Sequence, residues 1–380
     1  MAEHPSKRFR LNKKLGFWIA ALVNGCLVLE ILLSIFYPQT LVTKYSKIWR
    51  PDKTFGWRRQ ENVNTKLNSG EGTVHFLTDS DGFRINLNNA SSDDFDRSAS
   101  ILILGDSFLE AIQVENRYTI PQVLKENLCR THDANIMVYN SSCGGWNPNH
   151  YYLEAKRLAG RKIDVAITFL YVSNDVINTR VDQFKPRQPA KPHRLRFPHK
   201  LSGKEFTDSI LYPINDFLET RSQLFTLLKN RTQWLRVKLG LSTYYFSDVF
   251  KRSQSHSDCW DVTADVCKSV HDTFSEQGVP CIFVLLPAPY QVHENIFDKY
   301  ARAFDIDLDS VDIHQPNRLL KNTFESHALV LVDPLEYMRD EAERGQILFG
   351  HIDSHLNRDG HRAVADYITP MVESFIPDDQ

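Results

Sequence analysis

The stretch ILILGDSFLE, residues 101–110, decides the fold of this chain. Its four aliphatic residues run directly into Gly105, Asp106 and Ser107, as in a buried strand that ends at a polar turn. In one interpretation this is an ordinary strand-to-helix turn, with Asp106 or Ser107 capping the helix. In the other, Ser107 is a nucleophile at the carboxyl edge of a parallel sheet, where open α/β folds bind ligands. The second interpretation requires a base, an orienting acid and oxyanion donors elsewhere in the chain.

Further short apolar runs share the character of the first strand and predict four more strands buried on both faces. They are Ile136–Tyr139, Val165–Val172, Cys281–Leu286 and Leu329–Val332. Apolar residues at three- and four-residue spacing predict helices over 118–129, 149–158, 261–277, 334–344 and 360–375. The last helix is expected to take Asp359 as its N-cap. This alternation predicts an α/β fold, a three-layer α/β/α sandwich with a five-stranded, mostly parallel, flavodoxin-like sheet.

The composition indicates a largely globular chain. Of its 380 residues 42% are hydrophobic, and the formal net charge of −2 argues against a nucleic-acid partner. Five cysteines lie beyond the apolar N-terminal segment, so at least one of them stays unpaired. Cys259 and Cys267 stand eight residues apart in a predicted helix, too far along it to form a disulfide.

The N-terminal region predicts a single membrane-spanning helix over residues 16–38. The segment carries one charged residue, Glu30, and is long enough to cross a bilayer. Basic residues are concentrated before it, so residues 1–15 are expected in the cytoplasm and the body of the protein outside it. A cleaved signal peptide is the alternative. Glu30 and Asn24 within the span either mark a helix partner or are tolerated in the lipid.

The remaining chain divides into a connector with a small β module, residues 39–98, and a large domain, residues 99–380. The gap between the third and fourth strands predicts an insertion over 178–257 near the site, with a helical pattern over 216–239. Residues 185–200 within it are rich in proline and basic side chains. They form either a solvated loop or a cationic lip that attracts an anionic polymer or lipid headgroup.

A base and an acid for Ser107 stand together near the C-terminus. Asp353 and His355 are two residues apart in HIDSHLNRDGHR, so an extended loop would project both to one side. A metal cluster of His351, Asp353, His355 and His361 is an alternative, although the spacing matches no metal motif. In a further alternative, these four residues are polar loop residues that serve only turns and caps.

Oxyanion donors are expected where the neighbouring strands end. In NSSCGGWNPNH, Gly144 or Gly145 allows a backbone N–H to approach a reacting carbonyl without a side chain in the way. In FLYVSNDVIN, Asn174 offers a side-chain amide.

This series of turns resembles the SGNH, or GDSL-type, serine hydrolase superfamily over roughly residues 99–375. The resemblance implies that Ser107 is the nucleophile, His355 the base and Asp353 the orienting acid. It also implies an oxyanion hole formed by the Ser107 amide, Gly145 (Gly144 as the alternative) and Asn174. The short spacing of Asp353 and His355 is similar to a subgroup that includes the alginate O-acetylation proteins, and Asp333 is the fallback acid.

We therefore expect a membrane-anchored, extracytoplasmic serine esterase that acts on acyl esters, above all O-acetyl esters of a carbohydrate. No cofactor and no metal are expected. One alternative is a polysaccharide O-acetyltransferase that receives acyl groups from a multi-span membrane partner. Another is a non-catalytic carbohydrate-binding protein. Trp146, beside the expected oxyanion hole, stacks on a sugar ring or packs in the core.

Overall fold

The computed structural model describes residues 7–39, 41, 48–69, 71–86, 98–132, 135–182, 206–232, 235, 247–252, 257–304, 306–350 and 354–376. The chain divides into two compact units. One comprises Met1–Thr43 with Pro192–Ser242, and the other Lys44–Lys191 with Thr243–Gln380. The basic segment 185–200 lies outside the described residues.

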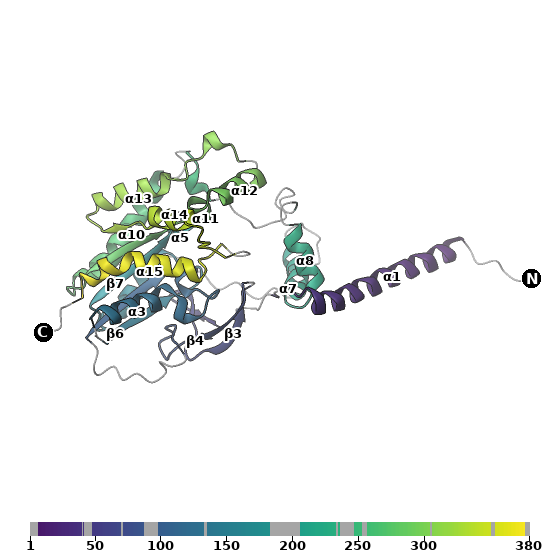
Figure 1. Ribbon diagram of the computed structural model, residues 1–380, viewed down its shortest axis with the longest axis horizontal. Coiled ribbons are helices and arrows are strands. Elements are labelled where there is room, and N and C mark those ends of the chain that lie inside the picture. The colour runs from purple at the N-terminus through teal and green to yellow at the C-terminus, as the bar shows by residue number, and fades with distance from the viewer. Residues whose placement is uncertain are drawn as a thin grey trace, which may run out of the picture. The chain divides into compact units, whose positions relative to one another are not determined.

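A parallel sheet forms the centre of the second unit (Figure 1). Its strands are β5 (Ala99–Gly105), β6 (Ile136–Ser142), β7 (Val165–Tyr171), β8 (Cys281–Leu286) and β9 (Leu331–Val332). Their order is β6-β5-β7-β8-β9, and every pair is parallel. All five predicted strands are confirmed, in the 2-1-3-4-5 order of flavodoxin-like folds. The order reverses at β5, so Ser107 lies beside the switch point of the sheet.

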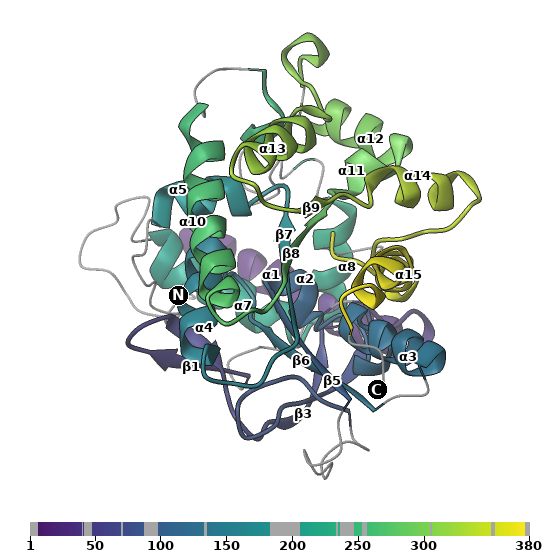
Figure 2. The same ribbon diagram turned by 90° about the vertical axis from the view of Figure 1, so that its left-hand side faces the viewer.

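Helices cover both faces of the sheet, which lies between them in Figure 2. Leu102 and Leu104 of β5 contribute to the core that includes α4, α5, α10 and α13, whereas Ile101 and Ile103 contribute to the core that includes α3, α14 and α15. The three-layer fold is thus confirmed. The helices of this unit are α2 (Ser107–Glu110), η2 (Asn116–Tyr118), α3 (Ile120–His132), α4 (Pro148–Leu158), α5 (Asp175–Asp182), η4 (Asp248–Phe250), α10 (Ser257–Ser275), α11 (Pro289–Val292), α12 (Glu294–Phe304), η6 (Leu308–Ser310), α13 (Gln315–Ser326), α14 (Leu335–Glu343) and α15 (Arg358–Glu373).

The five predicted helices correspond to α3, α4, α10, α14 and α15, with small shifts at their ends. The N-cap of α15 was predicted wrongly. Asn357, not Asp359, is the cap, because its side chain accepts the N–H groups of Asp359 and Gly360. The helix therefore begins at Arg358. Cys259 and Cys267 both lie on α10 and form no disulfide with each other, as their spacing predicts.

A small antiparallel module precedes the sheet in the sequence. It contains the pairs β1 (Trp49–Asp52) with β2 (Gly56–Arg59) and β3 (Asn64–Asn68) with β4 (Thr73–Leu77). Ile48, Val63, Leu67, Val74 and Phe76 form its core together with Ile112, which follows α2. The small module therefore packs against Ile112, shortly after the turn that carries Ser107.

The first unit contains one helix long and apolar enough to cross a membrane among the described residues. It is α1 (Lys7–Phe36), whose apolar part covers Lys14–Phe36, about 35 Å at 1.5 Å per residue. Asn24 within it donates to the Ala20 carbonyl at 2.8 Å, four residues earlier. This self-contained bond makes Asn24 easier to tolerate in an apolar environment.

Part of the predicted insertion belongs to this first unit. Residues 206–232 form η3 (Thr207–Leu211), α7 (Tyr212–Glu219) and α8 (Gln223–Arg231). The single helix predicted from residue 216 is wrong, because the Ser222 hydroxyl accepts the Phe225 N–H and starts a new helix. The Glu30 carboxylate accepts the Ser222 hydroxyl at 2.9 Å and the N–H groups of Gln223 and Leu224. Glu30 thus has a partner within the chain, at the start of α8.

Candidate active site

Ser107 lies where β5 meets the first turn of α2. Asp106 is the N-cap of this short helix, and its Oδ1 accepts the Phe108 N–H at 2.9 Å. Asp106, Phe108 and Leu109 are buried, whereas Ser107 is partly exposed. Gly105 allows this close packing, since a Cβ there would lie 2.9 Å from the Leu109 side chain. The strand-to-helix turn therefore buries its neighbours and leaves the serine hydroxyl accessible.

His355 meets Ser107 from the far end of the chain. Its Nε2 lies 2.8 Å from the Ser107 Oγ, across 248 residues of sequence. The loop that carries His355 is held by an isolated bridge between Phe349 and Leu356 and by the Gly350 N–H, which donates to the His355 carbonyl at 2.9 Å. The distance is that of a hydrogen bond between a nucleophile and its base.

The Phe108 ring packs against the His355 imidazole. Its ring centroid lies 4.6 Å from that of His355 and 4.0 Å from that of Tyr171, the last residue of β7. Phe108 is 2% exposed. Phe108 thus forms an aromatic surface against the imidazole.

A pair of buried carboxyl groups, Asp106 and Asp175, lies next to this dyad. Burial raises the pKa of Asp106, while the Phe108 N–H, His355 and the Asn174 amide act in the opposite direction. Burial and the nearby charge of Asp106 raise the pKa of Asp175 well above its usual range. The charged form is therefore disfavoured at both carboxyl groups, and more strongly at Asp175.

The glycine turn after β6 presents two amides, and one of them is already engaged. The Gly144 N–H donates to Glu110 Oε2 at 3.0 Å, and a Cβ on Gly144 would lie 2.7 Å from the same oxygen. Gly145 has a φ of +76°, a left-handed conformation that favours glycine. A Cβ there would also press on Trp57 at 3.2 Å. Of the two alternatives, Gly145 is the one whose amide is not committed to Glu110.

Asn174 lies immediately before α5, at the end of the turn that follows β7. Its side-chain amide lies close enough to the Asp106 carboxylate to lower the pKa of that group. An amide NH₂ has two N–H donors. Asn174 therefore offers N–H donors beside the residue that precedes Ser107.

Two buried charged residues that the sequence analysis missed hold the turn after Ser107 in place. Arg84 donates to the carbonyls of Glu110, Ala111 and Val114, each at 2.6 Å, and burial lowers its pKa to about 9. These carbonyls follow the end of α2, where Ala111 has a φ of +50°. The other residue is Glu110, which also accepts the Trp49 indole N–H at 2.8 Å. Burial raises the pKa of Glu110.

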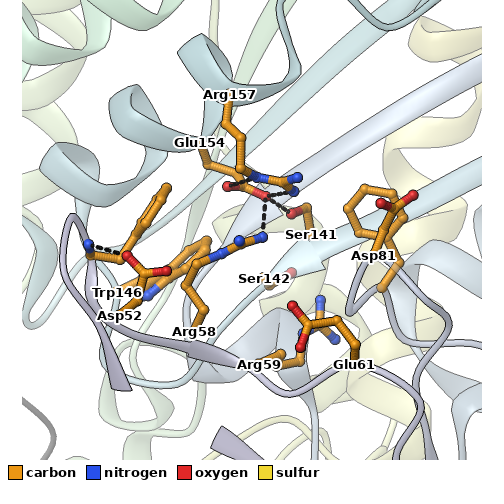
Figure 3. A network of polar contacts seen from close by, with 12 residues as sticks. Asp52, Arg58, Arg59, Glu61, Asp81, Ser141, Ser142, Trp146, Glu154 and Arg157 are labelled. Carbon is orange, nitrogen blue, oxygen red and sulfur yellow. Dashed lines mark hydrogen bonds and ion pairs between the residues drawn. The ribbon is translucent and has the colours of Figure 1, made fainter. Parts of the chain in front are cut away.

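A second polar network surrounds the buried carboxylate of Glu154 on α4 (Figure 3). Arg157 donates to it from the same helix, Ser141 from β6, and Arg58 of the small module lies 3.8 Å away. The Trp57 indole, next to Arg58, donates to the Gly144 carbonyl at 2.8 Å. The small module therefore contacts the glycine turn directly, through the Gly144 carbonyl.

Trp146 is 2% exposed and lies within the core. Its ring stacks on Phe55 at 5.2 Å and on His150 at 5.9 Å, and its indole N–H donates to the Trp57 carbonyl. Its faces are covered, so the structure shows the packing role and not a surface for a sugar ring.

Of the other acids and histidines proposed from the sequence, the structure describes Asp333 and His361. Asp353 and His351 lie outside the described residues. Asp333, the fallback acid, accepts the Asn317 amide at 2.7 Å and the Leu335 N–H, at the start of α14, at 3.0 Å. His361 is buried on α15, and its Nδ1 accepts the Ile120 N–H at 3.3 Å. The described part of the chain contains no group of three or more metal-binding side chains.

No protein-family model matches the chain, and no curated protein matches it. It is similar to solved structures. One is a lipolytic protein of the G-D-S-L family from Veillonella parvula, with 11% identity and a TM-score of 0.37 over 72% of this chain and 97% of that one. Another is LAE5, an alpha/beta hydrolase from the metagenome of Lake Arreo, with 14% identity and a TM-score of 0.40 over 74% and 98%. A third is a catalytic mutant of Axe2, an acetylxylan esterase from Geobacillus stearothermophilus, with 11% identity and a TM-score of 0.37 over 76% and 100%.

The family that the sequence resembles is thus represented among the solved structures. The narrower similarity to alginate O-acetylation proteins stays a prediction.

Proposed function

We propose that this chain is a serine esterase in which Ser107 is the nucleophile and His355 the general base. The observation that carries the proposal is the 2.8 Å separation of Ser107 Oγ and His355 Nε2. A partly exposed serine hydroxyl beside an imidazole can form an acyl-enzyme, because the imidazole accepts the hydroxyl proton as the oxygen attacks.

The reaction follows from this geometry. Ser107 Oγ bonds to the carbonyl carbon of the ester while its proton moves to His355 Nε2. The carbonyl oxygen becomes negative and accepts hydrogen bonds from the backbone N–H groups of Ser107 and Gly145 and from the side-chain amide of Asn174. His355 then gives its proton to the departing alkoxide oxygen, and the C–O bond of the ester breaks. Water then bonds to the acyl carbon while its proton moves to the same imidazole. The bond from that carbon to Ser107 Oγ breaks, and the imidazole returns the proton to Oγ, which releases the acid.

Two carboxylates support the imidazolium in this scheme. Asp353 orients the ring, in the role that the sequence pattern gives it. Asp106 is buried beside the site, and its charge acts on His355. Stabilisation of charge in a buried site is stronger than in water.

The substrate that we propose is an acyl ester, above all an O-acetyl ester, of a carbohydrate. We propose that α1 anchors the protein in the cytoplasmic membrane. The basic residues before the span hold its N-terminus in the cytoplasm, so the catalytic unit acts outside.

Labelling with a fluorophosphonate tests the nucleophile directly. The full chain in detergent micelles should react at a single serine and hydrolyse 4-nitrophenyl acetate, and Ser107→Ala should lose both properties. His355→Ala should lower labelling and turnover together. Labelling that persists in Ser107→Ala would exclude Ser107 as the nucleophile.

Adding sugar acceptors to the same assay separates hydrolysis from transfer. A hydrolase releases acetate at the same rate with and without an acceptor. Acetylated acceptor as the main product would instead assign transfer to the same acyl-enzyme.

A further inference from the structure

A cavity of 410 Å³ lies between α3, α15 and the η2 turn, outside the groups used for ester cleavage. The two helices run side by side in Figures 1 and 2. Four arginines line the cavity: Arg117, Arg130, Arg358 and Arg362. Glu126 and Asp366 also line it, so the arginines leave an excess of two positive charges (4 − 2 = 2) in a chain whose net charge is −2.

The arginines are not neutralised within the described part of the chain. None of the four lies within 4.0 Å of a described carboxylate oxygen, although several other arginines do. Among the described residues, Arg130 donates only to Asn127, at 3.2 Å, and Asp366 accepts the Asn127 amide at 2.8 Å. The guanidinium donors therefore remain available to a ligand.

Tyr118 holds two of the arginines in place. Its ring has the Arg358 Cζ 4.3 Å from its centroid and the Arg117 Cζ 4.7 Å from it. A guanidinium that stacks on an aromatic ring keeps its N–H edge free for hydrogen bonds. This arrangement orders the two side chains before a ligand binds and so reduces the entropic cost of binding.

The cavity begins a short distance along the chain from the proposed base. Arg358 is the first residue of α15 and follows His355 by three residues, a separation of at most about 10 Å between α-carbons. Arg362 lies one helical turn further along α15. The arginines at the start of α15 are therefore within reach of another part of a substrate whose ester is held at Ser107.

We propose that this arginine cavity binds an anionic group of the substrate, a carboxylate or a phosphate, next to the ester that Ser107 attacks. The proposal rests on the esterase function and narrows it to acylated polyanions. Planar guanidinium groups bind the oxygens of carboxylates and phosphates in pairs, which gives both affinity and position.

The test compares two acetylated polymers that differ in charge, with the full chain in detergent micelles. Acetylated polygalacturonate carries carboxylates, and acetylated xylan is the neutral reference. We measure the ratio of kcat/KM for the anionic to the neutral polymer. In Arg117→Gln/Arg358→Gln this ratio should fall about 10- to 100-fold, as expected for the loss of charge-assisted hydrogen bonds. In wild type the ratio should also fall as NaCl increases.

Arg344→Gln, an exposed arginine at the end of α14, is the matched control and should keep the wild-type ratio. A second pair variant, Arg130→Gln/Arg362→Gln, tests the distal part of the cavity and should also lower the ratio. A ratio that stays at the wild-type value in both pair variants would overturn the proposal. An equal fall of the ratio in Arg344→Gln would also overturn the proposal.

Binding separates this proposal from the esterase function. Ser107→Ala should bind oligogalacturonate or inorganic phosphate in calorimetry, and the Arg117→Gln/Arg358→Gln pair in the same background should bind at least about 10-fold more weakly. The stronger of the two ligands identifies the anion. Binding without any ester hydrolysis by wild type would refute the esterase and retain the anion site, and no binding of either ligand would refute the site.

Discussion

The carboxylate of Glu110 accepts the backbone N–H of Gly144 at 3.0 Å and so connects α2, which begins at Ser107, to the turn that carries Gly145. The same carboxylate accepts the Trp49 indole N–H. Two of the proposed oxyanion donors thus have their relative position fixed by one buried side chain.

Replacing Glu110 with glutamine should lower kcat about 10- to 100-fold, because small displacements of catalytic groups have effects of this size. Glutamine keeps the shape but sets an NH₂ group against one of two N–H donors. The measurement is kcat and KM for 4-nitrophenyl acetate, where kcat should fall and KM should change little. Glu336→Gln, at an exposed site on α14, is the control. Unchanged kcat would show that the glycine turn is held without Glu110.

Replacing Asn174 with alanine should lower kcat about 100- to 1000-fold while the protein stays folded. The side-chain amide is proposed to donate an N–H to the oxyanion, and it lies beside the Asp106 carboxylate, whose pKa it lowers. Asn295→Ala, at an exposed position on α12, should retain activity. Full activity in Asn174→Ala would remove Asn174 from the oxyanion hole.

The sheet could be predicted because strands buried on both faces are continuous apolar runs, and each of the five is such a run. Ser107 and His355 could be proposed because polar turns at strand ends converge on one edge of a parallel sheet. Their contact at 2.8 Å follows from the fold, not from local sequence, since 248 residues separate them.

Arg84 and Glu110 could not be predicted in the same way. Arg84 acts on three carbonyl groups, which no sequence pattern reveals. Glu110 gave a weak signal, as a carboxylate three residues after Ser107, next to apolar Phe108 and Leu109. The break between α7 and α8 was missed because Ser222 was not recognised as a cap within an apolar helical pattern. Helices α5 and α11 are too short for periodicity to identify them.

Replacing Phe108 with leucine should lower kcat roughly 2- to 12-fold, which corresponds to the 0.5–1.5 kcal/mol of an aromatic contact. The Phe108 ring supports the His355 imidazole at 4.6 Å, and leucine leaves that imidazole less constrained. Because Phe108 acts through His355, the acidic limb of the kcat pH profile should shift as well. A fall in stability with an unchanged pH profile and kcat would indicate a purely structural role.

Replacing Gly360 with alanine should destabilise the protein, although alanine usually favours a helix over glycine by about 1 kcal/mol. A Cβ at this position would lie 2.0 Å from the Leu348 carbonyl oxygen, so α15 would have to move. We expect a loss of about 1 to 3 kcal/mol in the free energy of unfolding, typical of overpacking. Urea unfolding of the full chain in micelles measures it, and Arg362→Ala on the same helix is the exposed control. A stability equal to or above wild type would contradict the close contact.

Replacing His361 with glutamine should make the protein less sensitive to acid. Burial lowers the pKa of His361 from 6.5 to about 3, so the unfolded chain binds a proton over this range and the folded chain does not. The free energy of unfolding therefore falls as the pH decreases from about 6.5 to about 3. Glutamine has no such titration, and its side-chain oxygen can accept the Ile120 N–H that His361 Nδ1 accepts. In urea unfolding at pH 7 and pH 4.5, the loss of stability on acidification should be smaller in His361→Gln than in wild type. His314→Gln, at an exposed site, should behave like wild type, and equal losses in all three proteins would show that His361 is not buried in its neutral form.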